Sequence, residues 1–379
     1  MRMRNLLGIA MGSLFLGACS SSVQNVTTVK LDDTSIVVLE EAKVTEKKTV
    51  KLSELIEDFQ IIRFENKDEA FFKSNWMYFS DNYICVRQKG APVKLFEKSG
   101  KYIGNVGNVG QGPGEYRFIY DVLINEKAQN IYVVNFAGDY ILRYDLTGNY
   151  LGKIELGEDI NKGRLSLSSD ASVLSLVHLC FKDRGDKFTG ANIQLQTPDS
   201  VQYVYVEEIA SEMTDKNGNR KGFNDEIWSY RNAGDFPFMM THTDTLYHYD
   251  SRTNKIQAAF TMTMDSEKKG DSFFIFNEWP HDYFVTIVGG DRNILVNKES
   301  STAYEVKFVN DFMGNMECYP TCQDGYFFQN WEPAQLKEKL EEVLLPGDCP
   351  ESQREKLESF MQTLNENDNN LLFLGKLKQ

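Results

Sequence analysis

The sequence predicts an all-β protein, namely a six-bladed β-propeller of four-stranded antiparallel blades with a C-terminal helical insertion. Three observations lead to this prediction. A unit of 48 residues recurs without a gap, its segments are short with alternating apolar residues, and 41% of the 379 residues are hydrophobic. That much apolar material can bury a large core, which excludes a disordered chain.

The first residues have the pattern of a cleaved bacterial signal. Two arginines precede an apolar run, Leu6–Ala18, which is too short to span a hydrocarbon layer. The small residues before Cys19 resemble a lipobox, in which cleavage leaves a Cys thiol that accepts diacylglycerol. We expect residues 1–18 to be a lipoprotein signal peptide. Residues 19–48 are polar and poor in aromatic residues, and we expect them to form a tether.

The expected membrane partner is the lipid bilayer, reached through the lipidated Cys19, because no other segment is apolar enough to span a membrane. We expect the protein in the outer cell envelope, anchored in the outer membrane. No acidic run directly follows Cys19, which favours the periplasmic side over the cell surface. The formal net charge is −14, and no Lys/Arg-rich run is present, so we expect no nucleic-acid partner.

The repeat is clearest in two copies, Phe96–Gly104 and Tyr144–Gly152. Each copy reads aromatic, acid, any residue, Ser or Thr, Gly, any residue, Tyr, aliphatic. The shared glycines, Gly100 and Gly148, supply the positive φ that a hairpin turn needs. A period of 48 residues that contains about four strands matches one propeller blade.

Further strand-like runs continue the pattern at Ala171–Phe181, Val201–Val206, Tyr283–Val288 and Tyr304–Val309. Residues 331–370 instead carry apolar residues spaced at three and four, which predicts a helical insertion in the last blade. The rest of the domain, residues 49–379, is long enough for six blades. A propeller must close its ring, and we expect Gln60–Phe64 and Leu371–Leu374 to pair in one blade.

Several of these segments are similar to a known family. Gly107–Tyr116 (GNVGQGPGEY), with Phe96–Gly100, resembles the most specific signature of six-bladed β-propeller lipoproteins with NHL-like repeats. The opening Leu52–Leu55 and the closing Asn367–Lys378 are similar to landmarks of the same family. The resemblance covers roughly residues 50–379. It implies the propeller fold and a lipid anchor, and it leaves the chemistry open.

Candidate ligand-binding residues are Trp228, Tyr230 and Arg231, in a polar stretch where a long loop would protrude. Aromatic and guanidinium groups suit stacking on sugars or peptides, although packing between blades uses the same residues. The glycine-rich segment before Glu115 lacks the helix and the Lys-Ser/Thr pair of a phosphate loop, so it predicts a tight crossover between blades. Glu115 is a further candidate, because its carboxylate could face the central channel.

The sequence predicts no catalytic residue and no resident cofactor or metal. From Asp215 to Glu226, oxygen-bearing side chains are spaced as in a calcium-binding loop. Arg220, however, stands where such a loop needs glycine. We therefore favour an exposed turn over a Ca²⁺ site for this segment. The four histidines are scattered, although a propeller can bring ligands together from distant blades.

Five cysteines follow Cys19. Cys318, Cys322 and Cys349 lie in polar, turn-rich sequence, and outside the cytoplasm we expect one disulfide among them, with its pairing open.

Two functions of different classes fit these features. The first is a membrane-tethered, non-enzymatic propeller that binds an envelope protein, or an extracellular glycan or peptide, through its loops. The second is a lyase or hydrolase of extracellular sugar or peptide that uses carboxylates and histidines of the channel with a divalent ion. A structural role in an envelope complex is a third possibility.

Overall fold

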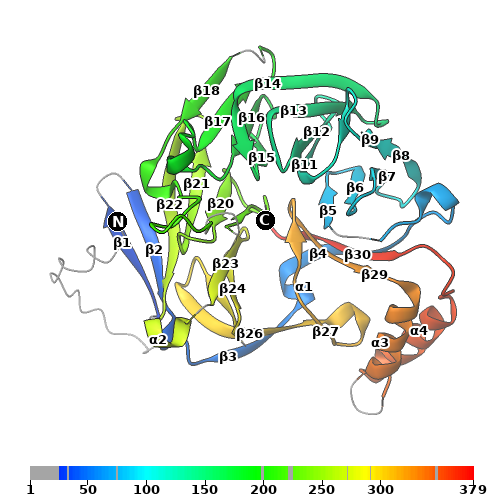
Figure 1. Ribbon diagram of the computed structural model, residues 1–379. Helices are drawn as coiled ribbons and strands as arrows, with labels where there is room; N and C mark the ends of the chain where they lie inside the picture. Colours follow the sequence, from blue (N-terminus) through cyan, green and yellow to red (C-terminus); the bar gives the residue numbers. More distant parts are fainter. Residues whose placement is uncertain are drawn as a thin grey trace.

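The computed structural model describes residues 25–31, 34–73, 76–197, 200–220, 225–270, 272–290, 292–345 and 349–379. The predicted signal peptide and Cys19 lie outside these residues. Six antiparallel sheets stand around a common centre as the blades of a propeller (Figure 1). The predicted fold class and the predicted number of blades are confirmed. We number the blades in chain order.

The first three blades each have four strands, which follow one another in chain order from the centre outward. Blade 1 contains β5 (Trp76–Phe79), β6 (Tyr83–Arg87), β7 (Val93–Glu97) and β8 (Tyr102–Val106). Blade 2 contains β11 (Ile119–Asn125), β12 (Asn130–Asn135), β13 (Ala137–Asp145) and β14 (Tyr150–Asn161). Blade 3 contains β15 (Arg164–Leu167), β16 (Val173–Val177), β17 (Gly190–Gln194) and β18 (Val201–Val204). A short parallel pair, β9 (Asn108–Val109) and β10 (Glu115–Tyr116), lies in the crossover from blade 1 to blade 2.

The last three blades carry additions. Blade 4 contains β19 (Ile227–Trp228), β20 (Pro237–Met240), β21 (Thr245–Asp250) and β22 (Lys255–Thr263), and α2 (Ser266–Lys269) follows it. Blade 5 contains β23 (Phe273–Glu278), β24 (Asp282–Val288), β25 (Asn293–Asn297), β26 (Thr302–Asn310) and β27 (Met316–Cys318). Blade 6 contains β28 (Cys322–Gln323), β29 (Tyr326–Trp331), β30 (Leu371–Leu377) and β4 (Ile56–Arg63).

The two repeat glycines are required by contacts between blades. Gly100 and Gly148 have φ values of +91° and +88°. A Cβ atom at Gly100 would lie 2.2 Å from the carbonyl oxygen of Arg63, and one at Gly148 would lie 2.0 Å from that of Asn105. Arg63 and Asn105 occupy the outer strands of the preceding blades, β4 and β8. The repeat therefore marks the point where each hairpin turn presses against the blade before it.

The ring closes as the sequence predicts. β4, from the start of the propeller, pairs antiparallel with β30 at its end, and Ile62 faces Leu372 in the register. The outer strand of blade 6 thus comes from the opposite end of the chain to its other three strands. This pairing removes two exposed sheet edges, which would otherwise template aggregation.

The N-terminal segment corrects the predicted tether. Within residues 26–51, three strands form: β1 (Val26–Leu31), β2 (Thr34–Glu40) and β3 (Lys47–Lys51). β2 adds in parallel to the outer edge of blade 4, and β3 adds in parallel to β26 of blade 5 (Figure 1). α1 (Leu52–Leu55) then leads into β4. The segment looks polar in sequence because edge strands are held by backbone hydrogen bonds and bury few side chains.

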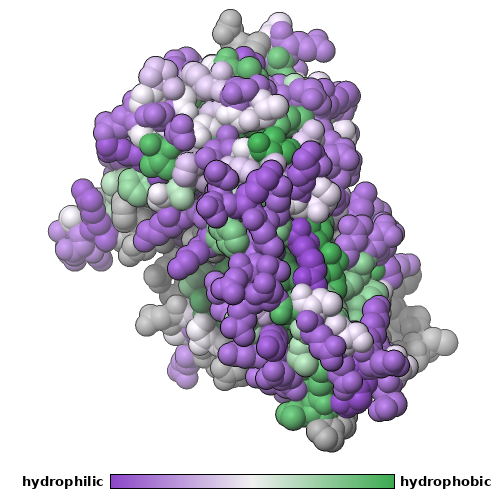
Figure 2. All heavy atoms as spheres, turned by 90° about the vertical axis from the view of Figure 1, so that its right-hand side faces the viewer, coloured by the Kyte–Doolittle hydropathy of each residue, from purple (hydrophilic) through white to green (hydrophobic). Residues whose placement is uncertain are grey.

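The predicted helical insertion is confirmed between β29 and β30. It consists of α3 (Pro333–Val343) and α4 (Glu351–Gln362), and the buried faces of both helices pack on a core that blades 5 and 6 share. The rim seen in Figure 2 is mostly hydrophilic, with small and separate hydrophobic patches. Within the described part of the chain, none of the helices combines the length and apolar character that crossing a membrane requires.

Candidate functional site

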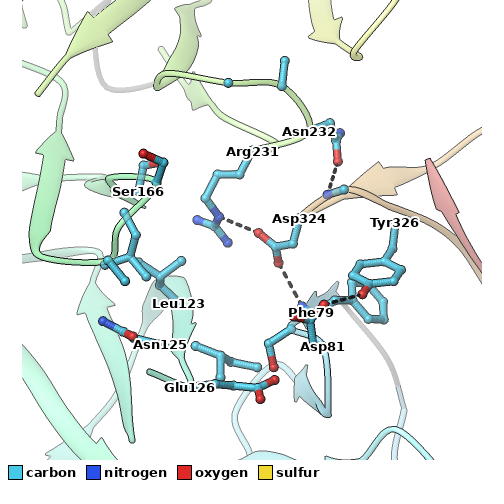
Figure 3. A pocket seen from close by; sticks show the side chains of 18 of the residues that line it. Phe79, Asp81, Leu123, Asn125, Glu126, Ser166, Arg231, Asn232, Asp324 and Tyr326 are labelled. Atoms are coloured by element: carbon cyan, nitrogen blue, oxygen red, sulfur yellow. Dashed lines mark hydrogen bonds and ion pairs between the residues drawn. The ribbon is translucent and has the colours of Figure 1, made fainter. Parts of the chain in front are cut away.

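A pocket of about 550 Å³ opens at the centre of the propeller, and we call it the central pocket. It is lined by the ends of the inner strands of blades 1, 2 and 3, by residues 231–235 of blade 4 and by the β28–β29 turn of blade 6 (Figure 3). Because the inner strands of a propeller converge, side chains far apart in sequence meet there.

Arg231 lines the central pocket and is nearly buried. Its Nε atom lies 2.5 Å from Asp324 Oδ1, and its Nη1 atom lies 2.7 Å from Asp121 Oδ2. The guanidinium also donates to the carbonyl oxygens of Leu165 and Val122, at 3.0 Å each. The exposed fractions of the Arg231, Asp121 and Asp324 side chains are 6%, 1% and 9%. We call these three residues the central hub.

The central hub holds one cation between two carboxylates in a water-poor environment. Burial alone would lower the pKa of Arg231, but the carboxylates of Asp121 and Asp324 raise it above its ordinary value, so the guanidinium stays charged. Burial raises the pKa of Asp324, and Arg231 opposes that shift. The backbone N–H of Phe79 donates to Asp324 Oδ2 at 2.9 Å, and that of Leu165 donates to Asp121 Oδ2 at 2.8 Å. Such bonds compensate part of the hydration that buried carboxylates lose.

Asn232 extends this hydrogen-bond network to blade 5. Its Nδ2 atom donates to Asn277 Oδ1 in blade 5 and to the carbonyl of Cys322 in blade 6, each at 2.9 Å. Its Oδ1 atom accepts the N–H of Gly325 at 2.8 Å. The central hub and Asn232 therefore connect the inner parts of all six blades. A pocket with this support is preorganised, so binding there costs little ordering of the protein.

Charged groups of both signs surround the mouth of the central pocket. The lining includes the carboxylates of Asp81, Glu126 and Asp235 and the ammonium groups of Lys127 and Lys376. Burial raises the pKa of Glu126, but hydrogen bonds from neighbouring side chains and from a backbone N–H outweigh it and lower that pKa below its ordinary value. The rim can therefore pair with both a cationic and an anionic group of one ligand.

The structure places the three neighbouring candidate ligand-binding residues, Trp228, Tyr230 and Arg231, in different surroundings. Arg231 lines the central pocket, but its guanidinium is engaged in the central hub. Tyr230 lines a smaller cavity of about 140 Å³, where its ring centroid lies 6.2 Å from that of Trp76. Trp228 packs against the core between blades 4 and 5, and its Nε1 atom donates to Thr241 at 3.4 Å.

Glu115 does not face the central pocket, which corrects that prediction. It belongs to β10, ahead of the first residue of β11, whereas the central pocket lies at the last residues of β11. Its Oε2 atom accepts the N–H of Gly112 at 2.8 Å. The crossover interpretation of Gly110–Tyr116 is confirmed, because this segment links the outer strand of blade 1 to the inner strand of blade 2.

Sequence reasoning missed Asp121 and Asp324. Asp121 lies inside the mostly apolar strand β11, directly before Val122–Ile124, and a carboxylate in such a strand is a signal that it has a buried partner. Asp324 occupies the β28–β29 turn with a φ of +56°, where its sequence resembles any exposed turn. Its partner is 93 residues away, so no local pattern could identify the pair.

The possible metal ligands are engaged elsewhere. Asp215 accepts the N–H groups of Asn217 and Asn219 in its own turn, whereas Glu226 accepts Lys162 Nζ at 2.6 Å. His242 faces Asp225 and His248 faces Glu278, at 3.4 and 2.5 Å. Across the described ranges, no group of three or more His, Cys, Asp or Glu side chains could hold a metal ion.

The predicted disulfide is not formed. Cys318, Cys322 and Cys349 are free, buried thiols in the core that blades 5 and 6 share with the helical insertion. Burial raises the pKa of Cys318 to about 12, which keeps its reactive thiolate scarce. The three cysteines therefore act as small apolar side chains in this core.

The fold and the central pocket define the class of protein: a six-bladed propeller whose inner strands are joined by a buried ion-pair hub beneath a polar pocket. The family model described as "Domain of unknown function (DUF4934)" matches residues 34–376, and the chain belongs to that family. The expected resemblance to six-bladed propellers is thus confirmed at the level of fold. No curated protein matches the sequence.

Three of the solved structures that match this chain come from species of Bacteroides. A protein from Bacteroides fragilis described as exported has a TM-score of 0.59 at 17% identity, over 88% of this chain and 100% of that one. A DUF4221 family member from Bacteroides vulgatus has a TM-score of 0.45 at 11% identity, over 86% and 98%. An auxiliary nutrient binding protein from Bacteroides thetaiotaomicron has a TM-score of 0.34 at 12% identity, over 59% and 57%. Because the identity to the Bacteroides fragilis protein is only 17%, this similarity supports the fold alone.

Proposed function

We propose that this chain is a lipid-anchored protein of the outer cell envelope, and that its central pocket binds a peptide or a peptide segment of a partner protein without catalysis. The observation that carries this proposal is the rim of the central pocket, where three carboxylates and two ammonium groups surround about 550 Å³ of space. A peptide presents charged groups of both signs together with backbone donors and acceptors. Such a ligand can pair with the whole rim.

The proposed location rests on Cys19 and the residues before it. The expected thioether-linked lipid would hold the protein on the periplasmic face of the outer membrane. The Bacteroides fragilis protein is described as exported, which agrees with a location outside the cytoplasm. Replacing Cys19 with Ala is expected to move the protein from the membrane fraction to the soluble fraction. Unchanged retention in the membrane would contradict a lipid anchor at this residue.

Gly234 offers a direct test of the central pocket. It lines the pocket, and a Cβ atom built there meets nothing within 4 Å. Gly234→Trp should therefore fill the pocket without straining the fold. Glu355→Trp, at an exposed position on α4, is the matched control for adding an indole.

The probe is a library of tripeptides that covers all combinations of charge, titrated by calorimetry against the purified protein. We expect wild type and Glu355→Trp to bind members that carry both an acidic and a basic side chain, and Gly234→Trp to lose this binding with an unchanged melting temperature. Binding that survives in Gly234→Trp, or no binding by wild type, contradicts the proposal. Release of cleaved peptide would instead favour the hydrolase alternative.

A further inference from the structure

A second pocket of about 430 Å³ lies at the end of β11 opposite to the central pocket. Its wall is the glycine-rich segment Gly110–Phe118, and its other side is residues 135–140 at the β12–β13 turn. We call it the glycine-loop pocket. β11 has seven residues, so the two pockets are separated by about 20 Å along the strand. We propose that the glycine-loop pocket is a binding site for a neutral carbohydrate.

The wall of the glycine-loop pocket has a fixed shape. The Glu115 carboxylate folds back over the loop, and a Cβ atom at Gly110 would lie only 1.9 Å from its Oε2 atom. The hydroxyl of Tyr116 donates to the carbonyl of Val106 and accepts the N–H of Val93, which ties the loop to blade 1. The hydroxyl of Tyr144 donates to the carbonyl of Gly114 at 2.9 Å, which ties it to blade 2. A loop held from both sides needs little further ordering when a ligand binds.

Aromatic rings line this fixed wall, and one of them is unusually exposed. Phe118 is 72% exposed, the largest value among the large hydrophobic side chains of the described residues. Its backbone is nevertheless anchored, because its carbonyl accepts the N–H of Phe136 at 2.6 Å. Phe136 and Tyr140 line the same pocket. An exposed ring on an anchored backbone gains contact energy when a flat apolar surface covers it.

The polar groups of the glycine-loop pocket suit a ligand that is rich in hydroxyl groups. Its lining contains one carboxylate, Glu115, and one guanidinium, Arg117, so the charges of the lining sum to zero. The Glu115 carboxylate is further engaged by the N–H of Gly112. The amides of Gln111 and Asn135 add groups that both donate and accept hydrogen bonds.

A pyranose ring matches this combination. Its C–H groups form an apolar face that covers an aromatic ring, and its hydroxyls donate to and accept from amides around the edge. A volume of about 430 Å³ lies within the usual range for small-ligand sites, roughly 300–1,000 Å³. A lining of zero net charge provides no long-range electrostatic attraction for a charged sugar or an acidic peptide.

The experiment is a glycan array of neutral and acidic oligosaccharides probed with the purified protein, followed by calorimetric titration of the best neutral glycan. We expect wild type to bind neutral glycans, and Phe118→Ala and Gln111→Ala each to weaken that binding at least tenfold. Leu345→Ala removes a side chain that is 57% exposed and lies outside the pocket, and it is the control for loss of an exposed apolar group.

The outcomes separate this site from the central pocket. Gly234→Trp fills the central pocket and should leave glycan binding unchanged, whatever its effect on peptide binding. No binding to any glycan, binding only to acidic glycans, or equal affinity of wild type and Phe118→Ala overturns the proposal. Each variant is compared by melting temperature, so that loss of binding through unfolding is recognised.

Discussion

Arg231 and Asp324 are 93 residues apart in the chain, and their side chains meet at a distance of 2.5 Å beside the central pocket. Both residues have left-handed backbone conformations, with φ values of +54° and +56°. Such conformations are costly for residues other than glycine, and they persist where the surrounding structure determines them. These conformations aim a guanidinium and a carboxylate from two blades at each other. The pair therefore belongs to the architecture of the ring.

Replacing Arg231 with Met tests this role. The change leaves Asp324 buried without its cation and leaves Asp121 with only Arg164, whose Nη1 atom lies 3.7 Å from its Oδ1 atom. It also removes donors from the carbonyls of Val122 and Leu165. Breaking a buried ion pair on one side typically costs about 3–5 kcal/mol, and we expect a loss of this size in the free energy of unfolding. Urea denaturation followed by tryptophan fluorescence measures it.

The control for this variant is Arg252→Met. Arg252 pairs with Asp250, but its side chain is 82% exposed, and we expect the free energy of unfolding to stay near the wild-type value. If both variants unfold at the same urea concentration as wild type, the central hub does not stabilise the ring.

A second prediction concerns the repeat glycines. Gly148→Ala places a methyl group in a left-handed position and about 2.0 Å from the carbonyl oxygen of Asn105. Gly90→Ala is the matched control, because Gly90 also has a positive φ, of +70°, but nothing lies within 4 Å of the added Cβ atom. We expect Gly148→Ala to lower the free energy of unfolding by about 1–3 kcal/mol more than Gly90→Ala does. Equal losses would show that the backbone conformation alone requires glycine, without the contact between blades.

The sequence predicts the ring because the ring is built from local patterns. The turn glycines Gly100 and Gly148 mark the repeat, and hydrophobic alternation marks the strands around them. Closure by β4 and β30 could be predicted as well, since two short apolar strands stood outside the repeat and needed partners.

Two features lie beyond such patterns for physical reasons. β1 and β2 are held by backbone pairing at the edge of blade 4, so their polar sequence resembles a linker. The central hub joins Asp121, Arg231 and Asp324 across three blades, and only the closed ring brings them together. In the sequence, Arg231 and Asp324 look like residues of exposed loops, and Asp121 looks like a single charge within an apolar strand. The candidate site was therefore only partly predicted.

A third prediction is a loss of stability in mild acid caused by His178. This residue is fully buried, its Nδ1 atom accepts the N–H of Asn161 at 3.2 Å, and its Nε2 atom bonds to the carbonyl of Phe188 at 2.8 Å. Burial lowers its pKa to about 4, although the hydrogen bond to Phe188 opposes the shift. The unfolded chain has a His pKa near 6.5, so as the pH falls below about 6.5 the unfolded state takes up a proton before the folded state does.

The stabilising contribution of neutral His178 is therefore complete above about pH 6.5 and is lost as the pH falls toward about 4, by roughly 3 kcal/mol in total. We expect His178→Gln to remove this part of the pH dependence. Urea midpoints of wild type and variant, measured at half-unit steps across this window, give the difference directly. Parallel curves for the two proteins would contradict a neutral, buried His178.

The last prediction concerns how the propeller sits on the membrane. Asn25 is fixed to blade 5, because its side-chain amide exchanges two hydrogen bonds, of 2.8 and 2.9 Å, with the backbone of Ala303. Six residues lead from the proposed lipid attachment at Cys19 to Asn25, and they can span at most about 20 Å. The rim that carries β1 should therefore stay near the bilayer, whereas α4, on the other side of the ring in Figure 1, should lie farther away.

Energy transfer from the propeller to the bilayer measures this orientation. Because the five described native cysteines are buried, dyes can be placed selectively at Thr27→Cys and Glu355→Cys. On vesicles with acceptor-labelled headgroups we expect stronger energy transfer from position 27 than from position 355, because the short connection to Cys19 holds only the first position close to the lipid. We expect no transfer from either position when Cys19 is also replaced by Ala. Equal transfer from both positions would mean that the ring is not held by this edge.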